Sequence, residues 1–243
     1  MAAAKKVESV ITKKINESKR AFRIQIKLIE DYLGTLSSNP QIYTSFMYAK
    51  SVEKGDVSAE QVVNESEEIN FPDESKAGLT IIAKDDNGLF IYSQIITGFM
   101  KDKAINLMKI SDVKQAKSKI QKFVNVIDKK IYFQRDGVNI TKPDGINERP
   151  LRGMTPQGPI TSLVASESLS AGATLEFDIL LLGNDEITPQ YLYEVFKMGN
   201  THGLGQFRNG GYGKFIITRF DEIKYKDTSL GELDKEQAEL KLL

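Results

Sequence analysis

The feature of this sequence that most constrains its fold is a glycine-rich segment that joins a helical pattern to a strand pattern. The segment from Gly203 to Gly213 has five glycines in eleven positions. Glycine adopts left-handed backbone conformations and lets another backbone approach closely. Apolar residues at helical spacing begin after Thr188-Pro189, and alternating apolar residues follow from residue 214 to 225. The glycine-rich segment is therefore predicted to connect a helix to a strand.

This order excludes the two familiar glycine-rich loops that bind nucleotides. A P-loop needs Gly-Lys-Ser/Thr and a helix after the loop, whereas Gly213-Lys214 is followed by Phe215 and a strand pattern. A dinucleotide-binding fingerprint needs the order strand, loop, helix, which is the reverse of the order here. Nucleotide-hydrolysing chemistry therefore has little support.

The composition of the loop instead favours binding of nucleic acid phosphates. Successive backbone N–H groups in such a turn can converge on an anion, cationic side chains add charge, and aromatic rings can stack on bases. The alternative is a tight connection whose glycines serve packing alone. The candidate binding residues of the loop are Gly203, Gly205, Phe207, Arg208, Gly210, Gly211, Tyr212, Gly213 and Lys214.

Three cations outside the loop are further candidates for phosphate binding. Arg149 and Arg152 flank a bend at Pro150 and could hold a phosphate bidentately. The alternative is that both arginines form surface salt bridges. Lys101 follows Gly98-Phe99 in a predicted helix and is the third candidate.

The rest of the chain predicts an α+β fold with a ferredoxin-like antiparallel sheet. The elements expected before the glycine loop are a strand near 22–28, a short helix after Asn39-Pro40, a strand at 79–83 closed by a turn at 86–88, amphipathic helices at 93–109 and after Ser111, a hairpin around Asp136-Gly137, and strands at 160–169 and 175–181. Ser93 is the expected N-cap of the first long helix, in which Ile105 is expected on the apolar face. Ile42 is expected on the apolar side of the short helix after Asn39-Pro40. Two strands, a helix, the loop and a last strand form half of a split βαβ unit, which the earlier strand and helix complete. This RRM-like sheet would carry its helices on one face.

The glycine spacing resembles a known family. Gly203-x-Gly205, five residues, and Gly211-x-Gly213 are similar to the C-terminal glycine-rich loop of the RAMP superfamily, whose members build CRISPR effector backbones and process guide RNA. The segment 166–177 is similar to the hairpin before the last helix in that superfamily. The whole chain also resembles uncharacterised RAMP-like proteins of phage and prophage genomes. The resemblance implies binding of RNA or single-stranded nucleic acid, often in repeating assemblies, and it does not imply a reaction.

Composition limits the other possibilities. The chain has 33 basic and 33 acidic residues, so its formal net charge of zero argues against a general polyanion binder. It has no cysteine and one histidine, which excludes disulfides and makes a structural zinc site implausible. The N-terminus lacks the apolar core of a signal peptide, and no apolar run reaches about 18 residues. We therefore expect a cytoplasmic protein, in the host cytoplasm if it is phage-encoded, without a membrane partner, cofactor or metal.

The expected organisation is one domain with two flanking segments. Residues 1–20 are a basic N-terminal arm, residues 21–226 a RAMP-like domain, and residues 227–243 a charged C-terminal tail. An acidic stretch at 51–76 is predicted to be a surface insertion, because it has few large apolar groups.

Catalytic candidates are few. His202 is the only histidine and borders the loop, so it is the candidate for acid–base chemistry in RNA cleavage. Cleaving members of the superfamily often use a histidine in this way, but theirs usually lies far upstream of the loop. The alternatives for His202 are hydrogen bonding within the loop and contact with a base. The pair Asp85-Asp86 is predicted to lie in a turn and not in a metal site.

Three hypotheses follow from the sequence. The first is a non-enzymatic protein that binds single-stranded RNA or DNA, as a homo-oligomer or filament along the strand. The second is an RNA-processing endoribonuclease of the same fold. The third is a phage structural or host-interaction protein in which the loop shapes a subunit interface.

Overall fold

The computed structural model describes residues 19–45, 69, 71, 78–108, 110–156, 158–183, 186–225 and 228–233. Residues 1–18 of the predicted N-terminal arm, most of the acidic stretch and most of the C-terminal tail lie outside these residues, whereas Lys19 and Arg20 at the end of the arm lie in the first strand. The proposed domain boundaries therefore stay predictions.

The main sheet has the strand arrangement of a ferredoxin-like fold. Strand β1 (Lys19–Leu28) pairs antiparallel with β12 (Thr174–Leu182) on one side and with β13 (Phe215–Ile223) on the other. The other edge of β12 pairs with β7 (Val124–Val126) and β8 (Lys130–Arg135). Helix α4 (Ser93–Leu107) lies between β1 and β7 in the chain, and α6 (Pro189–Lys197) lies between β12 and β13.

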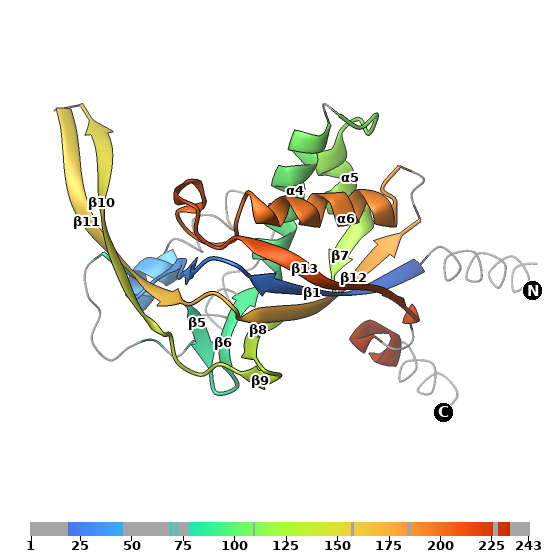
Figure 1. Cartoon of the computed structure of the whole chain (residues 1–243), viewed down its shortest axis with the longest axis horizontal. Helices are drawn as coiled ribbons and strands as arrows, with labels where there is room; N and C mark the ends of the chain where they lie inside the picture. The colour runs from blue at the N-terminus through green and yellow to red at the C-terminus, as the bar shows by residue number, and fades with distance from the viewer. Residues whose placement is uncertain are drawn as a thin grey trace, which may run out of the picture.

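Numbered in chain order, the four strand positions lie in the spatial order 4-1-3-2 with two helical crossovers, which is a βαββαβ unit. Its second position is filled by β7 and β8, and not by the strand predicted at 160–169. Figure 1 shows α4, α5 (Ala116–Phe123) and α6 on one face of this sheet. The α+β, ferredoxin-like fold class is confirmed. The sheet is extended beyond β8 by β6 (Gly88–Tyr92) and β5 (Ala83–Asp85), while β9 (Val138–Asn139) forms a hairpin with β8.

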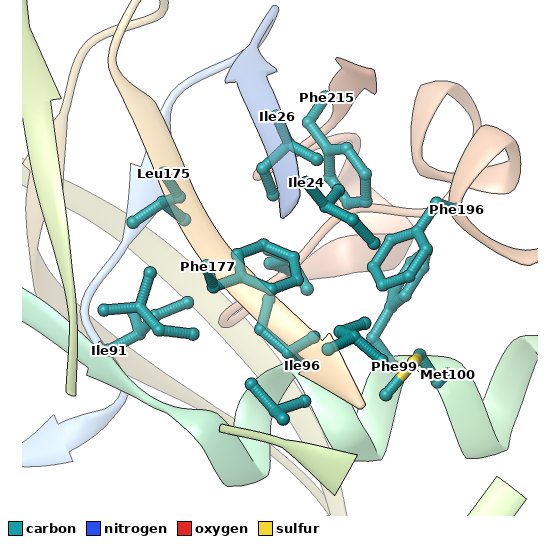
Figure 2. Close-up of a cluster of buried hydrophobic side chains, with 14 of the residues drawn as sticks. Ile24, Ile26, Ile91, Ile96, Phe99, Met100, Leu175, Phe177, Phe196 and Phe215 are labelled. Atoms are coloured by element: carbon teal, nitrogen blue, oxygen red, sulfur yellow. The ribbon is translucent and has the colours of Figure 1, made fainter. Parts of the chain in front are cut away.

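Alternating residues explain how the sheet buries one face. Phe22, Ile24 and Ile26 of β1 are buried, while Arg23 and Gln25 between them lie on the opposite face. Figure 2 shows the core between sheet and helices. Its labelled side chains come from β1, β6, α4, β12, α6 and β13, and they are Ile24, Ile26, Ile91, Ile96, Phe99, Met100, Leu175, Phe177, Phe196 and Phe215. Phe99 packs on Phe196 and Phe215 with ring centroids 6.2 and 5.2 Å apart.

A second sheet was not predicted. Strands β10 (Gly145–Thr155) and β11 (Gly158–Leu169) form a long hairpin that projects from the main sheet in Figure 1. Strand β11 also pairs with β4 (Leu79–Ile81) and β2 (Tyr32–Leu33), and β3 (Leu36–Ser37) pairs with β4. The strand predicted at 160–169 exists, but it belongs to this sheet. The turn at Gly172 therefore links two sheets and does not close a hairpin with β12.

Helix boundaries confirm some local signals and correct others. The helix predicted after Thr188-Pro189 is α6, which Thr188 caps by accepting a hydrogen bond from the Tyr191 N–H at 3.1 Å, with Pro189 at the first helical position. Ser93 is not an N-cap, because α4 begins at Ser93 itself. Ile105, which was predicted to face the core, is 44% exposed. The second basic helix ends at Phe123, because the following residues join the sheet as β7.

A small satellite core lies beside β5 and β6. Ile69, inside the acidic stretch predicted to be a surface insertion, is buried, and Phe71 packs on the buried Tyr43 with ring centroids 5.8 Å apart. Ile42 was predicted to be on the apolar side of the helix after Asn39-Pro40 but is exposed. Tyr43 takes the inward position instead. Ile69 and Phe71, the described residues of the acidic stretch, therefore pack on the domain at this cluster.

The helices within the described residues are all too short or too polar to span a lipid bilayer.

Candidate nucleic-acid interface

The neck of the glycine loop is closed by backbone hydrogen bonds. The Leu204 N–H donates to the Gly213 carbonyl at 2.9 Å, and the Gly213 N–H donates to the Asp31 carbonyl at 2.7 Å. A Cβ at Gly203 would lie 2.0 Å from the Tyr212 carbonyl oxygen, and one at Gly213 would lie 1.9 Å from the Leu204 carbonyl oxygen. Only glycine fits at these two positions, so both residues serve close backbone packing.

The apex of the loop depends on unusual backbone conformations. Gly205 and Gly211 have φ values of +79° and +93°, and Phe207 has φ +51°, which is uncommon for a bulky residue. The ring of Phe207 occupies the space that a side chain at Gly210 would need. The Gly210 and Gly211 N–H groups donate to the Phe207 and Arg208 carbonyls in the short 3₁₀ turn η2 (Arg208–Gly210).

These hydrogen bonds change the expected binding mechanism. Four loop N–H groups, those of Leu204, Gly210, Gly211 and Gly213, are already used inside the protein. They are therefore not available to converge on a phosphate. The loop can therefore bind an anion only through its side chains or its other N–H groups.

The loop forms one wall of a cationic cleft. A cleft of about 480 Å³ lies between the loop, α4 and α5, and its lining includes Lys101 from α4, Lys117 from α5 and Arg208 from the loop apex. Asp102 is the acidic residue in the lining. The structure therefore brings two of the predicted cations, Lys101 and Arg208, to the same depression, although they are separated by 107 positions in the chain.

Asp102 neutralises part of this charge. Its Oδ2 atom lies 3.0 Å from the Lys103 Nζ and 3.5 Å from the Arg208 Nη1. Lys103 is buried, whereas Arg208 and Asp102 are each about half exposed. The cleft lining thus has three cations, Lys101, Lys117 and Arg208, and one carboxylate, so the cleft keeps a local positive charge despite the neutral net charge of the chain.

The opposite side of the loop apex packs on the hairpin β10–β11. The guanidinium of Arg149 lies over the Phe207 ring, with the carbon 5.0 Å from the ring centroid, and its Nη2 donates to the Gln206 Oε1 at 3.0 Å. The Asn147 Nδ2 donates to the Tyr212 hydroxyl at 3.1 Å. Arg149 is only 8% exposed and Phe207 is 42% exposed. Arg149 is therefore not the surface ion pair that was considered as its alternative role.

The remaining predicted residues lie at the edges of the loop or outside the site. Lys214 comes directly before β13, with its amine near Gly211, and its carbonyl accepts hydrogen bonds from two N–H groups of the β1–β2 connection. Arg152 lies in β10 opposite Thr161, and its side chain is outside what the structure describes. The structure thus joins the loop, Arg149 and Lys101 around one apex, while Arg152 is placed only by its backbone.

The catalytic candidates are placed as follows. His202 is exposed, and its Nδ1 lies 2.8 Å from the Thr201 hydroxyl, which is its side-chain contact among the described residues. Asp85 precedes the predicted turn, where its carboxylate accepts hydrogen bonds from the Lys130 Nζ at 2.9 Å and the Tyr132 hydroxyl at 2.8 Å. Burial opposes ionisation of Asp85, but these hydrogen bonds outweigh it and lower its pKa. In the described part of the chain, no three potential metal ligands lie together.

The open face of the main sheet carries a second depression of about 420 Å³ whose charges are largely paired. Arg23 donates two hydrogen bonds of 2.8 Å to Asp178, and these raise the pKa of the guanidinium. Burial raises the pKa of Asp128, whose Oδ2 accepts the Asp178 N–H. This face offers paired charges where an RRM-like sheet would offer stacking rings to bases.

Sequence reasoning missed several residues of the site. Lys117 lies in the predicted basic helix, but nothing in its local sequence distinguishes it from the neighbouring lysines. Gln206 was read only as part of the loop, and its hydrogen bonds reach Ser166 on β11 and Thr80 on β4. The alternation of Asn147 and Arg149 in β10 was a usable signal, because residues two apart in a strand share a face.

Comparisons with known proteins add little beyond this geometry. No protein-family model and no curated protein matches the chain. Among solved structures, it is similar to a chain in the cryo-EM structure of the type III-B Cmr-beta bound to cognate target RNA, with a TM-score of 0.47 and 14% identity over 92% of this chain and 67% of that chain.

Proposed function

We propose that this protein is a non-enzymatic binding protein for single-stranded nucleic acid, with the strand lying across the cationic cleft and the apex of the glycine loop. The observation that carries the proposal is the position of Lys101, Lys117 and Arg208 around one cleft against a single carboxylate. Cations grouped in this way bind a phosphate backbone through charge, largely without sequence preference.

The aromatic apex supports a single strand as the ligand. Phe207 directly precedes the cleft residue Arg208 in the loop, with its ring partly exposed and 5.8 Å from the Tyr212 ring. An exposed ring can stack on an unpaired base, whereas the bases of a duplex are stacked on each other. Phosphates held by the cleft and a base stacked at Phe207 together account for a single strand better than for a duplex.

The assembly of several copies along the strand is part of this proposal. We infer this assembly from the sequence resemblance to RAMP proteins, which form repeating assemblies. The same resemblance is the basis for a phage origin and for a location in the host cytoplasm. Size-exclusion chromatography with light scattering measures the mass of the assembly. We expect a mass increase in steps of 27.2 kDa protomers as the oligonucleotide is lengthened. Assembly that is independent of nucleic acid would favour the structural or host-interaction hypothesis instead.

The binding experiment compares two triple variants by fluorescence anisotropy with a labelled single-stranded RNA and the corresponding DNA. Lys101→Ala/Lys117→Ala/Arg208→Ala removes the cations of the cleft. The matched control removes three lysines that do not line the cleft, Lys27, Lys142 and Lys197.

Each phosphate contact contributes roughly 0.7 to the slope of log affinity against log salt for single strands, so loss of three contacts should lower the slope by about 2. The control should keep the wild-type slope. Equal losses in the two variants, or no binding by the wild type at low salt, would refute the proposal.

RNA cleavage has no comparable support, because His202 has no carboxylate beside its ring among the described residues.

A further inference from the structure

The guanidinium of Arg149 is buried among neutral groups. Its Nη1 donates to the Ser166 Oγ at 3.2 Å and to the Asn147 Oδ1 at 3.4 Å, and its Nη2 donates to the Gln206 Oε1 at 3.0 Å. Its Nε atom is buried and has no hydrogen-bond partner. Among the described residues, none of the groups that accept from this cation is a carboxylate. A buried charge normally has a counter-charge, because removal from water disfavours the ionised form.

Donors around Arg149 converge on one oxygen atom. The Gln206 Oε1 lies 3.0 Å from the Arg149 Nη2, 3.1 Å from the Ser166 Oγ and 3.3 Å from the Thr80 Oγ1. The Thr80 hydroxyl can instead donate its single proton to the Ser166 Oγ at 2.7 Å, which makes a short hydrogen-bonded chain from Thr80 through Ser166 to this oxygen. Hydrogen bonds from a cation are stronger when the acceptor is ionised. The neutral amide oxygen therefore occupies a position suited to an oxyanion.

Rigid strands hold these donors in place. Arg149 and Ser166 lie on the paired strands β10 and β11, and Thr80 lies on β4, which pairs with β11 directly at Ser166. Ser166 is fully buried. The positions of the three donors are therefore set by the second sheet, independently of the loop.

The group that fills the position comes from the loop apex. Gln206 is half-buried and lies between Gly205 and Phe207, which both have positive φ, and the Phe207 ring covers the guanidinium. The left-handed backbone of Phe207 stores conformational strain. The neck of the loop is fixed by its own hydrogen bonds, so the apex can move without unfolding the connection to β13.

We propose that Arg149, Ser166 and Thr80 form an oxyanion pocket, that Gln206 plugs this pocket in the free protein, and that a phosphate oxygen replaces the Gln206 amide oxygen in the bound protein. This inference rests on the proposed function, because the bound strand supplies the phosphate. It adds a second phosphate position on the hairpin side of the loop apex, opposite the cationic cleft, with Phe207 between the two.

The first test places a permanent anion in the pocket. The carboxylate in Gln206→Glu would neutralise Arg149, and we expect the melting temperature to rise by about 3 °C. The same carboxylate would block the phosphate, so the affinity for single-stranded RNA should fall roughly tenfold. Asn209→Glu is the matched control, because it adds the same charge to an exposed position of the apex. It should give no thermal gain and a smaller loss of affinity.

The second test opens the pocket and changes the source of the phosphate. Gln206→Ala should bind inorganic phosphate measurably by isothermal titration calorimetry, and the double variant Gln206→Ala/Arg149→Lys should lose this binding, because lysine cannot reproduce the forked guanidinium donors. The wild type is also titrated with inorganic phosphate alone. If inorganic phosphate binds as tightly as RNA does, the natural ligand of the pocket is free phosphate and not the phosphate of a nucleic acid.

The two proposals fail in different ways. If the wild type binds no RNA but Gln206→Ala binds phosphate through Arg149, the pocket stands and the proposed function fails. If the wild type binds RNA, the pocket is overturned when Gln206→Glu matches Asn209→Glu in both melting temperature and RNA affinity. Absence of phosphate binding by folded Gln206→Ala overturns it as well.

Discussion

Replacing Gly213 with alanine should destabilise this protein far more than most single-methyl changes. The new Cβ would lie 1.9 Å from the Leu204 carbonyl oxygen, so the neck of the loop would have to open. Opening would break the hydrogen bond from the Leu204 N–H to the Gly213 carbonyl and the one from the Gly213 N–H to the Asp31 carbonyl. The φ value of +69° at Gly213 is also unfavourable for any residue with a Cβ.

The magnitude follows from these contributions. A left-handed alanine costs about 1–2 kcal/mol, and each lost hydrogen bond costs about 1 kcal/mol, which together give about 3–4 kcal/mol in the free energy of unfolding. Gly98→Ala is the matched control, because Gly98 lies inside α4 and a Cβ there would have no heavy atom within 4 Å. This change should stabilise the protein by about 0.5–1 kcal/mol through helix propensity.

The assay is urea unfolding at 25 °C followed by circular dichroism, with free energies from linear extrapolation. The two alanine variants should move in opposite directions from the wild type. A Gly213→Ala variant within about 1 kcal/mol of the wild type would refute the closed-neck geometry, because that geometry leaves no space for a methyl group.

Three further changes test the fold and its charges. Arg135 and Ser170 hold the pKa of Asp144 below its ordinary value, so Asp144→Asn should lower the melting temperature at pH 7, and the difference should disappear as the pH falls below about 4. Burial raises the pKa of Asp128, so the ionised carboxylate destabilises the folded state at pH 7 and the protonated form does not at low pH. Asp128→Asn should therefore raise the melting temperature at pH 7. It should match the wild type near pH 3, about one unit below the ordinary pKa of an aspartate. Phe196→Ala should cost about 3–5 kcal/mol in urea unfolding, because it leaves a cavity between α4, β12 and β13.

The local sequence predicted those elements whose apolar pattern matches their final environment. Strand β1 alternates because one face meets the helices and the other meets solvent, and α6 has both its threonine cap and its N-terminal proline in sequence. The glycine loop was located correctly between α6 and β13. Ile105 was misplaced, because a helical periodicity alone does not say where the covering element ends.

The candidate site could be predicted only in part. Arg208 and Phe207 were identifiable from their place in the loop, and Lys101 from its place in a basic segment. The expected use of the backbone amides was not supported for four loop residues, because their N–H groups close the neck and apex. Hydrogen-bond partners such as the Asp31 carbonyl are distant in sequence, and no local pattern identifies them.

The sequence by itself determined the ferredoxin-like fold class and the position of the glycine loop, because hydrophobic periodicity and glycine placement are local properties. Only the tertiary structure decided what surrounds that loop. The second sheet carries Arg149 to one side of the apex, and α4 and α5 carry Lys101 and Lys117 to the other. These neighbours are set by long-range pairing such as that of β11 with β4, and the energy of such pairing resides in contacts between segments and not within them.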